Sequence, residues 1–168
     1  MPCALGPQKL AGAHGTVRQR TEMIELALGG HEAFVLSKLE IERGEVSYTV
    51  DTLKQIKETN PDDELFLMMG DDSLESFPSW RDPETICKLA TPLVVNRPGS
   101  GEVDLSVLKQ YVSPERFESF EKLKITSPRI EISSSEIRKK VGEGGSIRFL
   151  TPRSVEKYIE TQKLFVDN

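Results

Sequence analysis

The chain has 168 residues, of which 37% are hydrophobic and 29% charged, and its formal net charge is −5. This length and composition predict one globular domain around a single hydrophobic core. An acidic chain offers no general positive field to nucleic acid or to an anionic membrane, and no apolar run is long enough to span a bilayer. We therefore expect a cytoplasmic protein that binds neither nucleic acid nor membranes, and in which any phosphate-binding groups act locally.

Cysteine and histidine give no sign of a metal site. The two cysteines, Cys3 and Cys87, match no zinc-binding or redox spacing, so we expect free structural thiols. His14 and His31 each stand beside glycine in an expected loop, where a solvated histidine is commoner than a catalytic one. The sequence therefore predicts no metal held by the protein itself.

The first half of the chain alternates helices with strands. Residues 16–19 have the form of a capping box, which begins a helix that ends at 29–30. A short strand is expected over 33–37 and a helix over 49–58. The run 65–69 is apolar without alternation, which is typical of a parallel strand covered on both faces and predicts a central place in the sheet.

The second half continues the alternation. A helix is expected over 82–89, with Asp82-Pro83 as its N-cap pair, and a buried strand over 92–95. Residues 99–120 are polar and aperiodic, so they form either a surface helix pair or a variable insert. The remaining predicted elements are a strand ending at 130–132, a helix from a capping box at 133–136 to Gly142, and a helix after Thr151-Pro152. This order predicts an α/β fold with a mainly parallel sheet and flanking helices.

Polar groups follow the predicted strand at 65–69. Gly70, Asp71 and Asp72 would lie at the carboxyl edge of the sheet, where open α/β folds bind ligands. A glycine there lets the backbone approach a ligand closely, and a carboxylate such as Asp72 can accept both hydroxyls of a ribose. The alternative is that the two acids only cap the short helix that follows.

Three further side chains could meet a nucleotide from loops. Trp80, the only tryptophan, lies in an irregular Pro-containing segment, where it could stack on a flat heterocycle or act as a hydrophobic plug under the loop. Arg97 follows the strand at 92–95 and so reaches the same sheet edge, where it could complement a phosphate or a carboxylate. Lys9 could do the same from the N-terminal loop.

A serine-rich turn is the sharpest signal for an anion. Ser133, Ser134 and Ser135 open a helix whose first-turn N–H groups and dipole favour negative charge, and Arg138 lies about one turn further on. Together these groups could hold a triphosphate. Serine caps with a nearby arginine also occur on many helices that bind no ligand.

A series of motifs runs along the chain, namely Ser47-Tyr48-Thr49, Asp51-Thr52-Leu53, Gly70-x-Asp72-x-Leu74 through Phe77-x-x-Trp80, Arg97-Pro98-Gly99 and Ile132-Ser133-Ser134-Ser135-x-Ile137-Arg138. In order and spacing they resemble the bacterial nicotinate-nucleotide adenylyltransferases of the nucleotidyltransferase superfamily. The resemblance covers nearly the whole chain and is most specific in the serine motif and the block that ends at Trp80. It implies a Rossmann-like fold and transfer of an adenylyl group from ATP to nicotinate mononucleotide, giving deamido-NAD and pyrophosphate in NAD biosynthesis.

The roles of individual residues on the ATP side follow from this resemblance alone. The Ser133 to Ser135 turn and Arg138 would hold the ATP phosphates, with the backbone at Gly70 close to the nucleotide. Arg138 and Lys9 would be the basic groups that neutralise charge during catalysis, together with Mg²⁺. No covalent enzyme intermediate is implied.

The resemblance also assigns the residues that bind the mononucleotide. Asp72 would bind the ribose and Trp80 would stack on the pyridine ring. Thr49 and the backbone around Trp80 and Arg81 would receive the nicotinate carboxylate. The full set of implied substrate-binding residues is Tyr48, Thr49, Asp72, Trp80, Arg81 and Arg97.

The family pattern includes a segment that is not found in this sequence. Family members begin with a strand, a Gly-rich loop ending in His-x-Gly-His, a helix and a second strand, whereas residues 1–5 resemble the end of that second strand and no His-x-Gly-His occurs. The family's Pro-Pro-His-Lys stands here as Gly6-Pro7-Gln8-Lys9. We therefore expect a fold without its first strand-helix unit, unpaired strand edges, a tendency to aggregate and poor activity of the chain as written. Either a start codon lies further upstream or the chain is a nucleotide-binding remnant, and the retained downstream motifs favour the first explanation.

Two other functions stay open at this stage. A protein without catalytic activity could sense ATP or a pyridine nucleotide, which the absent histidines favour. An adenylyltransferase for another phosphate monoester, such as phosphopantetheine, is disfavoured because a thiol-tailed substrate has no flat ring to stack on Trp80. The sequence also leaves open whether the protein forms a homo-oligomer.

Overall fold

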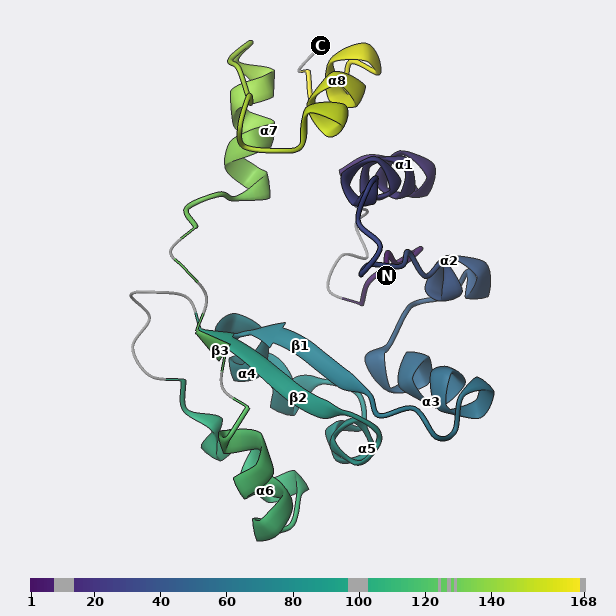
Figure 1. Cartoon of the computed structure of the whole chain (residues 1–168), viewed down its shortest axis with the longest axis vertical. Helices are drawn as coiled ribbons and strands as arrows, with labels where there is room; N and C mark the ends of the chain where they lie inside the picture. The colour runs from purple at the N-terminus through teal and green to yellow at the C-terminus, as the bar shows by residue number, and fades with distance from the viewer. Residues whose placement is uncertain (8–13, 97–102, 124, 127, 129, 167–168) are drawn as a thin grey trace. The chain divides into compact units, whose positions relative to one another are not determined.

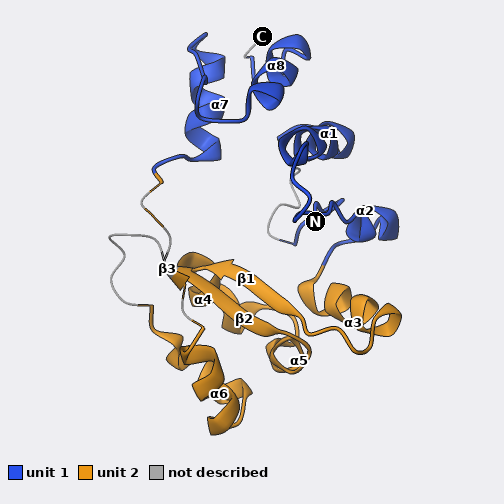
Figure 2. Cartoon of the chain, in the orientation of Figure 1, with its two compact units in different colours: residues 1–47, 131–168 blue, residues 48–130 orange. Residues whose placement is uncertain are grey.

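The chain divides into two compact units. A computed structural model describes residues 1–7, 14–96, 103–123, 125–126, 128 and 130–166 (Figure 1). Unit 1 consists of Met1–Ser47 together with Glu131–Asn168, and unit 2 consists of Tyr48–Ile130 (Figure 2). The single domain expected from the sequence stays a prediction.

Unit 2 contains a parallel sheet. Its strands are β1 (Phe66–Gly70), β2 (Thr91–Asn96) and β3 (Ile125–Thr126), in the order β1-β2-β3. The register pairs Met68 with Leu93 and Gly70 with Val95, so the carboxyl ends of β1 and β2 lie level. The strands predicted at 65–69 and 92–95 and their parallel direction are thus confirmed.

The central position predicted for β1 is wrong for the described sheet, in which β1 is an edge strand. Phe66 and Met68 point to one face and are exposed, whereas Met69 is buried on the other. An unbroken apolar run reports that both faces carry apolar side chains. It does not report how many strands lie beside it, because strand pairing depends on distant parts of the chain.

The helices of unit 2 pack on the sheet face that carries Met69 and Val94. The predicted helix at 49–58 is confirmed as α3, and the one at 82–89 as α5, whose N-cap Asp82 accepts a hydrogen bond from the Thr85 N–H at 3.2 Å. The helical elements of this unit are α3 (Thr49–Thr59), α4 (Asp71–Ser76), the 3-10 helix η1 (Phe77–Ser79), α5 (Pro83–Leu89), the 3-10 helix η2 (Leu105–Tyr111) and α6 (Pro114–Glu121).

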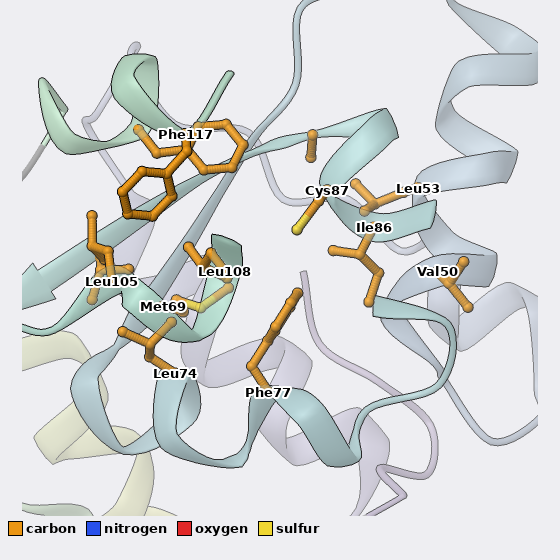
Figure 3. Close-up of a cluster of buried hydrophobic side chains, with 13 residues drawn as sticks. Val50, Leu53, Met69, Leu74, Phe77, Ile86, Cys87, Leu105, Leu108 and Phe117 are labelled. Carbon is orange, nitrogen blue, oxygen red and sulfur yellow. The ribbon is translucent and has the colours of Figure 1, made fainter. Parts of the chain in front are cut away.

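The core of unit 2 is built around Phe77, which is fully buried (Figure 3). It lies among side chains from β1, α3, α4 and α5. The polar stretch 99–120 forms a helix pair in its described part, and this pair does not lie only on the surface: Leu105, Leu108 and Phe117 are buried in the same core (Figure 3).

Unit 1 is mainly helical. Its helices are α1 (Val17–Leu28), α2 (Leu39–Arg43), α7 (Ser134–Gly142) and α8 (Arg153–Thr161). The capping box that predicts α1 is present in full, since Thr16 accepts from the Gln19 N–H and the Gln19 side chain accepts from the Thr16 N–H. Helix α8 buries Val155 and Ile159, as the spacing predicts. No helix in the described part of the chain combines the length and the apolar character needed to cross a membrane.

Two predicted strands are wrong. Residues 33–37 form no strand, and Phe34 and Val35 are exposed. Residues 130–132 are also irregular, and the third strand of the sheet is Ile125–Thr126 instead. In both segments the apolar pattern suits a strand, but a strand also needs a neighbour for its backbone hydrogen bonds, and local pattern does not reveal one.

Candidate functional site

Tyr48 and Arg81 meet at the beginning of α3. Tyr48 is the N-cap residue of this helix in an extended conformation, and its side chain makes no capping hydrogen bond. The Arg81 guanidinium lies over the Tyr48 ring, 4.8 Å from its centroid, and Nη1 donates to Oδ2 of Asp51 at 3.1 Å. A cation, an aromatic face and the positive end of a helix dipole therefore share one small region of unit 2, in which Thr49 is the first helical residue.

The segment that carries Arg81 is fixed by the residue that follows it. Asp82 has a φ of +53°, in the left-handed region that aspartate tolerates better than most residues. Hydrogen bonds from the side chain and backbone of Thr85 hold the pKa of Asp82 below its ordinary value. The carboxylate is therefore charged at neutral pH, which secures both the cap of α5 and the turn that leads out of Arg81.

Trp80 lies immediately after η1 and packs partly against the core. Its ring centroid is 5.4 Å from that of Phe77, with an interplanar angle of 48°. The indole Nε1 donates to Oγ of Ser76 at 3.3 Å, and the Trp80 N–H donates to the Phe77 carbonyl at 3.0 Å. Part of the indole ring therefore acts as the hydrophobic plug that the sequence offers as an alternative. The side chain stays partly exposed, so a surface for stacking remains.

The carboxyl end of β1 carries the three polar positions that the sequence singles out. Gly70 has φ −81° and ψ 169°, a conformation open to any residue, so its backbone angles do not require glycine. Oδ1 of Asp71 accepts from the Asp72 N–H at 3.0 Å, and Oδ1 of Asp72 accepts from the Ser73 N–H at 2.9 Å. Both acids thus bond to N–H groups within the first turn of α4, whose N-cap is Gly70 without a side-chain cap, so neither acid is the N-cap residue; the Asp72 side chain is exposed.

A cavity of about 340 Å³ lies beside this strand end. It is lined by Asp71, Leu74, Glu75, Asp104, Ser106 and Val107 among others. Oδ1 of Asp104 accepts from the Ser106 N–H at 2.8 Å. Three of the lining side chains, those of Asp71, Glu75 and Asp104, are acidic, so the cavity suits a sugar or an amine better than a phosphate.

The serine motif lies at the N-terminus of α7 in unit 1. Ser133 is the N-cap, and its Oγ accepts from the Glu136 N–H at 3.1 Å, which is the serine half of the predicted capping box. Ser134 and Ser135 form the exposed first turn, and Nη2 of Arg138 donates to Oγ of Ser135 at 3.1 Å. The hydroxyl oxygen of Ser133 therefore already accepts a hydrogen bond from the helix backbone. Ser134, Ser135 and Arg138 present their polar groups at the surface.

A second cavity, of about 390 Å³, lies along α7. It is lined by Ser133, Glu136, Ile137, Lys140, Glu143 and Leu150 among others. Its walls come from α7 and from residues just before and after this helix. Neither Ser135 nor Arg138 is among the described residues that line it.

The structure groups the predicted site residues by unit. Unit 2 holds Tyr48, Thr49, Gly70, Asp72, Trp80 and Arg81, and unit 1 holds Ser133, Ser134, Ser135 and Arg138. Among these residues, the Arg81 guanidinium lies over the Tyr48 ring, and Arg138 donates a hydrogen bond to Ser135. Lys9 and Arg97 lie outside the described residues.

Sequence reasoning assigned no role to Asp51, although it occurs within one of the motifs. An acid in the first turn of a helix is explained well enough by the helix dipole, so its pairing with Arg81, 30 positions away, leaves no local signal. Among the described residues, no three side chains of the His, Cys, Asp or Glu types are grouped to hold a metal ion.

Comparison with known proteins places the chain in a family. Residues 2–140 match the cytidylyltransferase-like family. A relative from Rhodopirellula baltica named probable nicotinate-nucleotide adenylyltransferase is 36% identical over 165 residues, which is 98% of this chain and 77% of the relative. A protein of the same name from Citrifermentans bemidjiense is 35% identical over 179 residues, covering 99% of this chain and 83% of the relative.

Solved structures support the same fold. Plasmodium falciparum nicotinic acid mononucleotide adenylyltransferase complexed with NaAD has a TM-score of 0.71 at 22% identity, covering 97% of this chain and 79% of that one. The same enzyme complexed with APC gives 0.67 at 24%, covering 89% and 76%. The predicted fold class, a Rossmann-like α/β nucleotidyltransferase fold with a mainly parallel sheet, is thus confirmed, and the chain belongs to the nicotinate-nucleotide adenylyltransferase family of nucleotidyltransferase enzymes.

Proposed function

We propose that the protein transfers the adenylyl group of ATP to nicotinate mononucleotide, giving deamido-NAD and pyrophosphate in NAD biosynthesis. Family membership over nearly the whole chain supports this reaction. The observation that carries the substrate assignment is the Arg81 guanidinium over the Tyr48 ring at the beginning of α3, with Trp80 next to Arg81 in the chain. A flat ring and a negative carboxylate on one small molecule match an aromatic surface beside a cation and a helix N-terminus.

The mononucleotide would be held entirely by unit 2. Trp80 stacks on the pyridine ring with the part of its indole that Phe77 does not cover. The Thr49 hydroxyl and the Arg81 N–H donate to the nicotinate carboxylate. The Trp80 N–H is a weaker candidate than the sequence suggests, because it already donates to the Phe77 carbonyl. Asp72 accepts from the ribose hydroxyls.

The ATP phosphates would be held at the beginning of α7. Its first-turn N–H groups, the hydroxyls of Ser134 and Ser135 and the Arg138 guanidinium all favour negative charge. Lys9 and the backbone at Gly70 are the further groups proposed for ATP, whereas Arg97 belongs to the proposed mononucleotide set. Mg²⁺ would accompany ATP as the ion that neutralises phosphate charge.

The chemistry is a direct displacement at the α-phosphorus of ATP. The mononucleotide phosphate attacks in line, the bond to the β-phosphate breaks, and pyrophosphate leaves with its electron pair. The protein's part is to orient the two phosphates and to neutralise their charge, which together account for most catalysis of this type. Arg138 and Lys9 are the basic groups proposed for that role. The cytoplasmic location and a homo-oligomeric state remain predictions.

The test is pyrophosphate release from MgATP with either nicotinate or nicotinamide mononucleotide. It compares the 168-residue chain with one extended in frame upstream of Met1. Turnover of the extended protein with preference for the acid supports the proposal. Binding of mononucleotide by both proteins without turnover by either would replace it with the non-catalytic binding protein that the sequence leaves open.

A further inference from the structure

We propose that the Arg81 side chain, held over Tyr48 by Asp51, makes the site select a pyridine nucleotide with a carboxylate over one with a neutral amide. The inference rests on the proposed function and deepens it. In this scheme Arg81 is a specificity-determining residue, and Asp51 is a positioning residue that acts through it.

Two neighbours hold the Arg81 guanidinium in place, and some of its N–H donors stay available for a ligand. Oδ2 of Asp51 accepts from Nη1 of Arg81 at 3.1 Å, and the Arg81 Cζ lies over the Tyr48 ring, 4.8 Å from the ring centroid. A guanidinium has five N–H donors, and this ion pair uses one of its nitrogen atoms. The remaining donors are available to a carboxylate bound between Trp80, which precedes Arg81 in the chain, and the beginning of α3.

Asp51 does not cancel the charge of Arg81 completely. It lies in the first turn of α3, where the positive end of the helix dipole shares its negative charge. The guanidinium therefore keeps an attraction for an added anion. The neutral amide of nicotinamide mononucleotide gains no such attraction, so Arg81 favours nicotinate mononucleotide.

The pair contributes little as a structural tether. The side chains of Arg81 and Asp51 are 58% and 35% exposed, and ion pairs of that exposure add little stability. Helices α3 and α5 are already joined through Val50, Leu53 and Ile86, all buried in the core (Figure 3). Breaking the pair should therefore leave unit 2 folded.

The test is a titration of the 168-residue chain with nicotinate or nicotinamide mononucleotide, followed by the fluorescence of Trp80, its only tryptophan. Arg81→Gln should weaken binding of the acid about tenfold and leave binding of the amide unchanged, since it removes one charge-assisted hydrogen bond. Arg81→Lys should keep part of the preference, and Asp51→Asn should reduce it by less than Arg81→Gln. The matched control is Lys88→Gln, which breaks the exposed Lys88–Glu84 pair on α5 of the same unit and should change neither affinity.

The double variant D51R/R81D distinguishes a role in selecting the acid from a purely structural role of the ion pair. It restores an ion pair with the charges exchanged, so a tether would be rescued whereas acid preference would stay lost. Rescue of the preference by this variant, or an equal loss of both ligands in Arg81→Gln, would overturn the inference while leaving the proposed function intact. Failure of both the 168-residue chain and the protein extended upstream of Met1 to bind either nucleotide would overturn the proposed function, and this inference with it. Circular dichroism of each variant confirms that it is folded.

Discussion

Phe77 packs against the aromatic rings of Trp80 and Tyr111 in unit 2, and its replacement by leucine is the most direct test of that packing. The ring is fully buried in the core (Figure 3). Its centroid is 5.4 Å from that of Trp80 and 5.8 Å from that of Tyr111. Leucine keeps most of the apolar burial but removes both aromatic pairs. Each pair contributes about 0.5–1.5 kcal/mol, so Phe77→Leu should lower the free energy of unfolding by about 1–3 kcal/mol. That is a large part of the roughly 5–15 kcal/mol that stabilises a typical domain.

The assay is urea unfolding followed by Trp80 fluorescence, which reports on unit 2 because it is the only tryptophan. With a slope of about 2 kcal/mol per molar urea, a loss of about 2 kcal/mol shifts the midpoint down by about 1 M. The control is Phe149→Leu, at a residue that is 87% exposed in unit 1, and it should change stability by less than about 0.5 kcal/mol when followed by circular dichroism. A Phe77→Leu midpoint equal to that of the unaltered chain would refute the reasoning.

Three further predictions concern single groups. Ser133→Ala removes the cap of α7 and should lower stability by about 1 kcal/mol in thermal unfolding; an unchanged melting temperature would contradict the capping role. The hydroxyl of Tyr158, with help from Arg18, holds the pKa of Glu22 below its ordinary value, so this stabilisation is present above the ordinary carboxyl pKa and lost as pH falls through the lowered one. Tyr158→Phe should therefore flatten the loss of stability in acid, and an identical pH profile would argue against the link. Burial raises the pKa of the Cys87 thiol to about 11, so a thiol reagent at pH 8 should modify Cys3 in the native chain and Cys87 only after unfolding; rapid native labelling of both would disprove this.

The fold could be predicted where local chemistry decides it. Helix α1 has a complete capping box and α5 an Asp-Pro start, and both begin where the sequence indicates. The strands at 33–37 and 130–132 were wrong because pairing depends on residues far away in the chain. The edge position of β1 was missed for the same reason, since composition describes the faces of a strand and not its neighbours.

The candidate site divides in the same way. The serine cap of α7 is a local feature and is found where its spacing predicts, with Ser133 bonded to Glu136. The stacking of Arg81 on Tyr48 and its pairing with Asp51 join segments far apart in the sequence, so no local pattern reveals them. The motif resemblance implies that Tyr48 and Arg81 belong to the pocket, but the pairing of Asp51 with Arg81 becomes visible only in the folded structure.

The contrast between the two cysteines has a practical consequence. Cys87 is buried in unit 2, whereas Cys3 in unit 1 is partly exposed, and Trp80 lies in unit 2. An acceptor dye attached to Cys3 and the single donor Trp80 would therefore label the two units separately, without any substitution in the chain. The efficiency of energy transfer would then report the distance between Trp80 and the dye, and a change on adding MgATP or mononucleotide would show that nucleotide binding alters it.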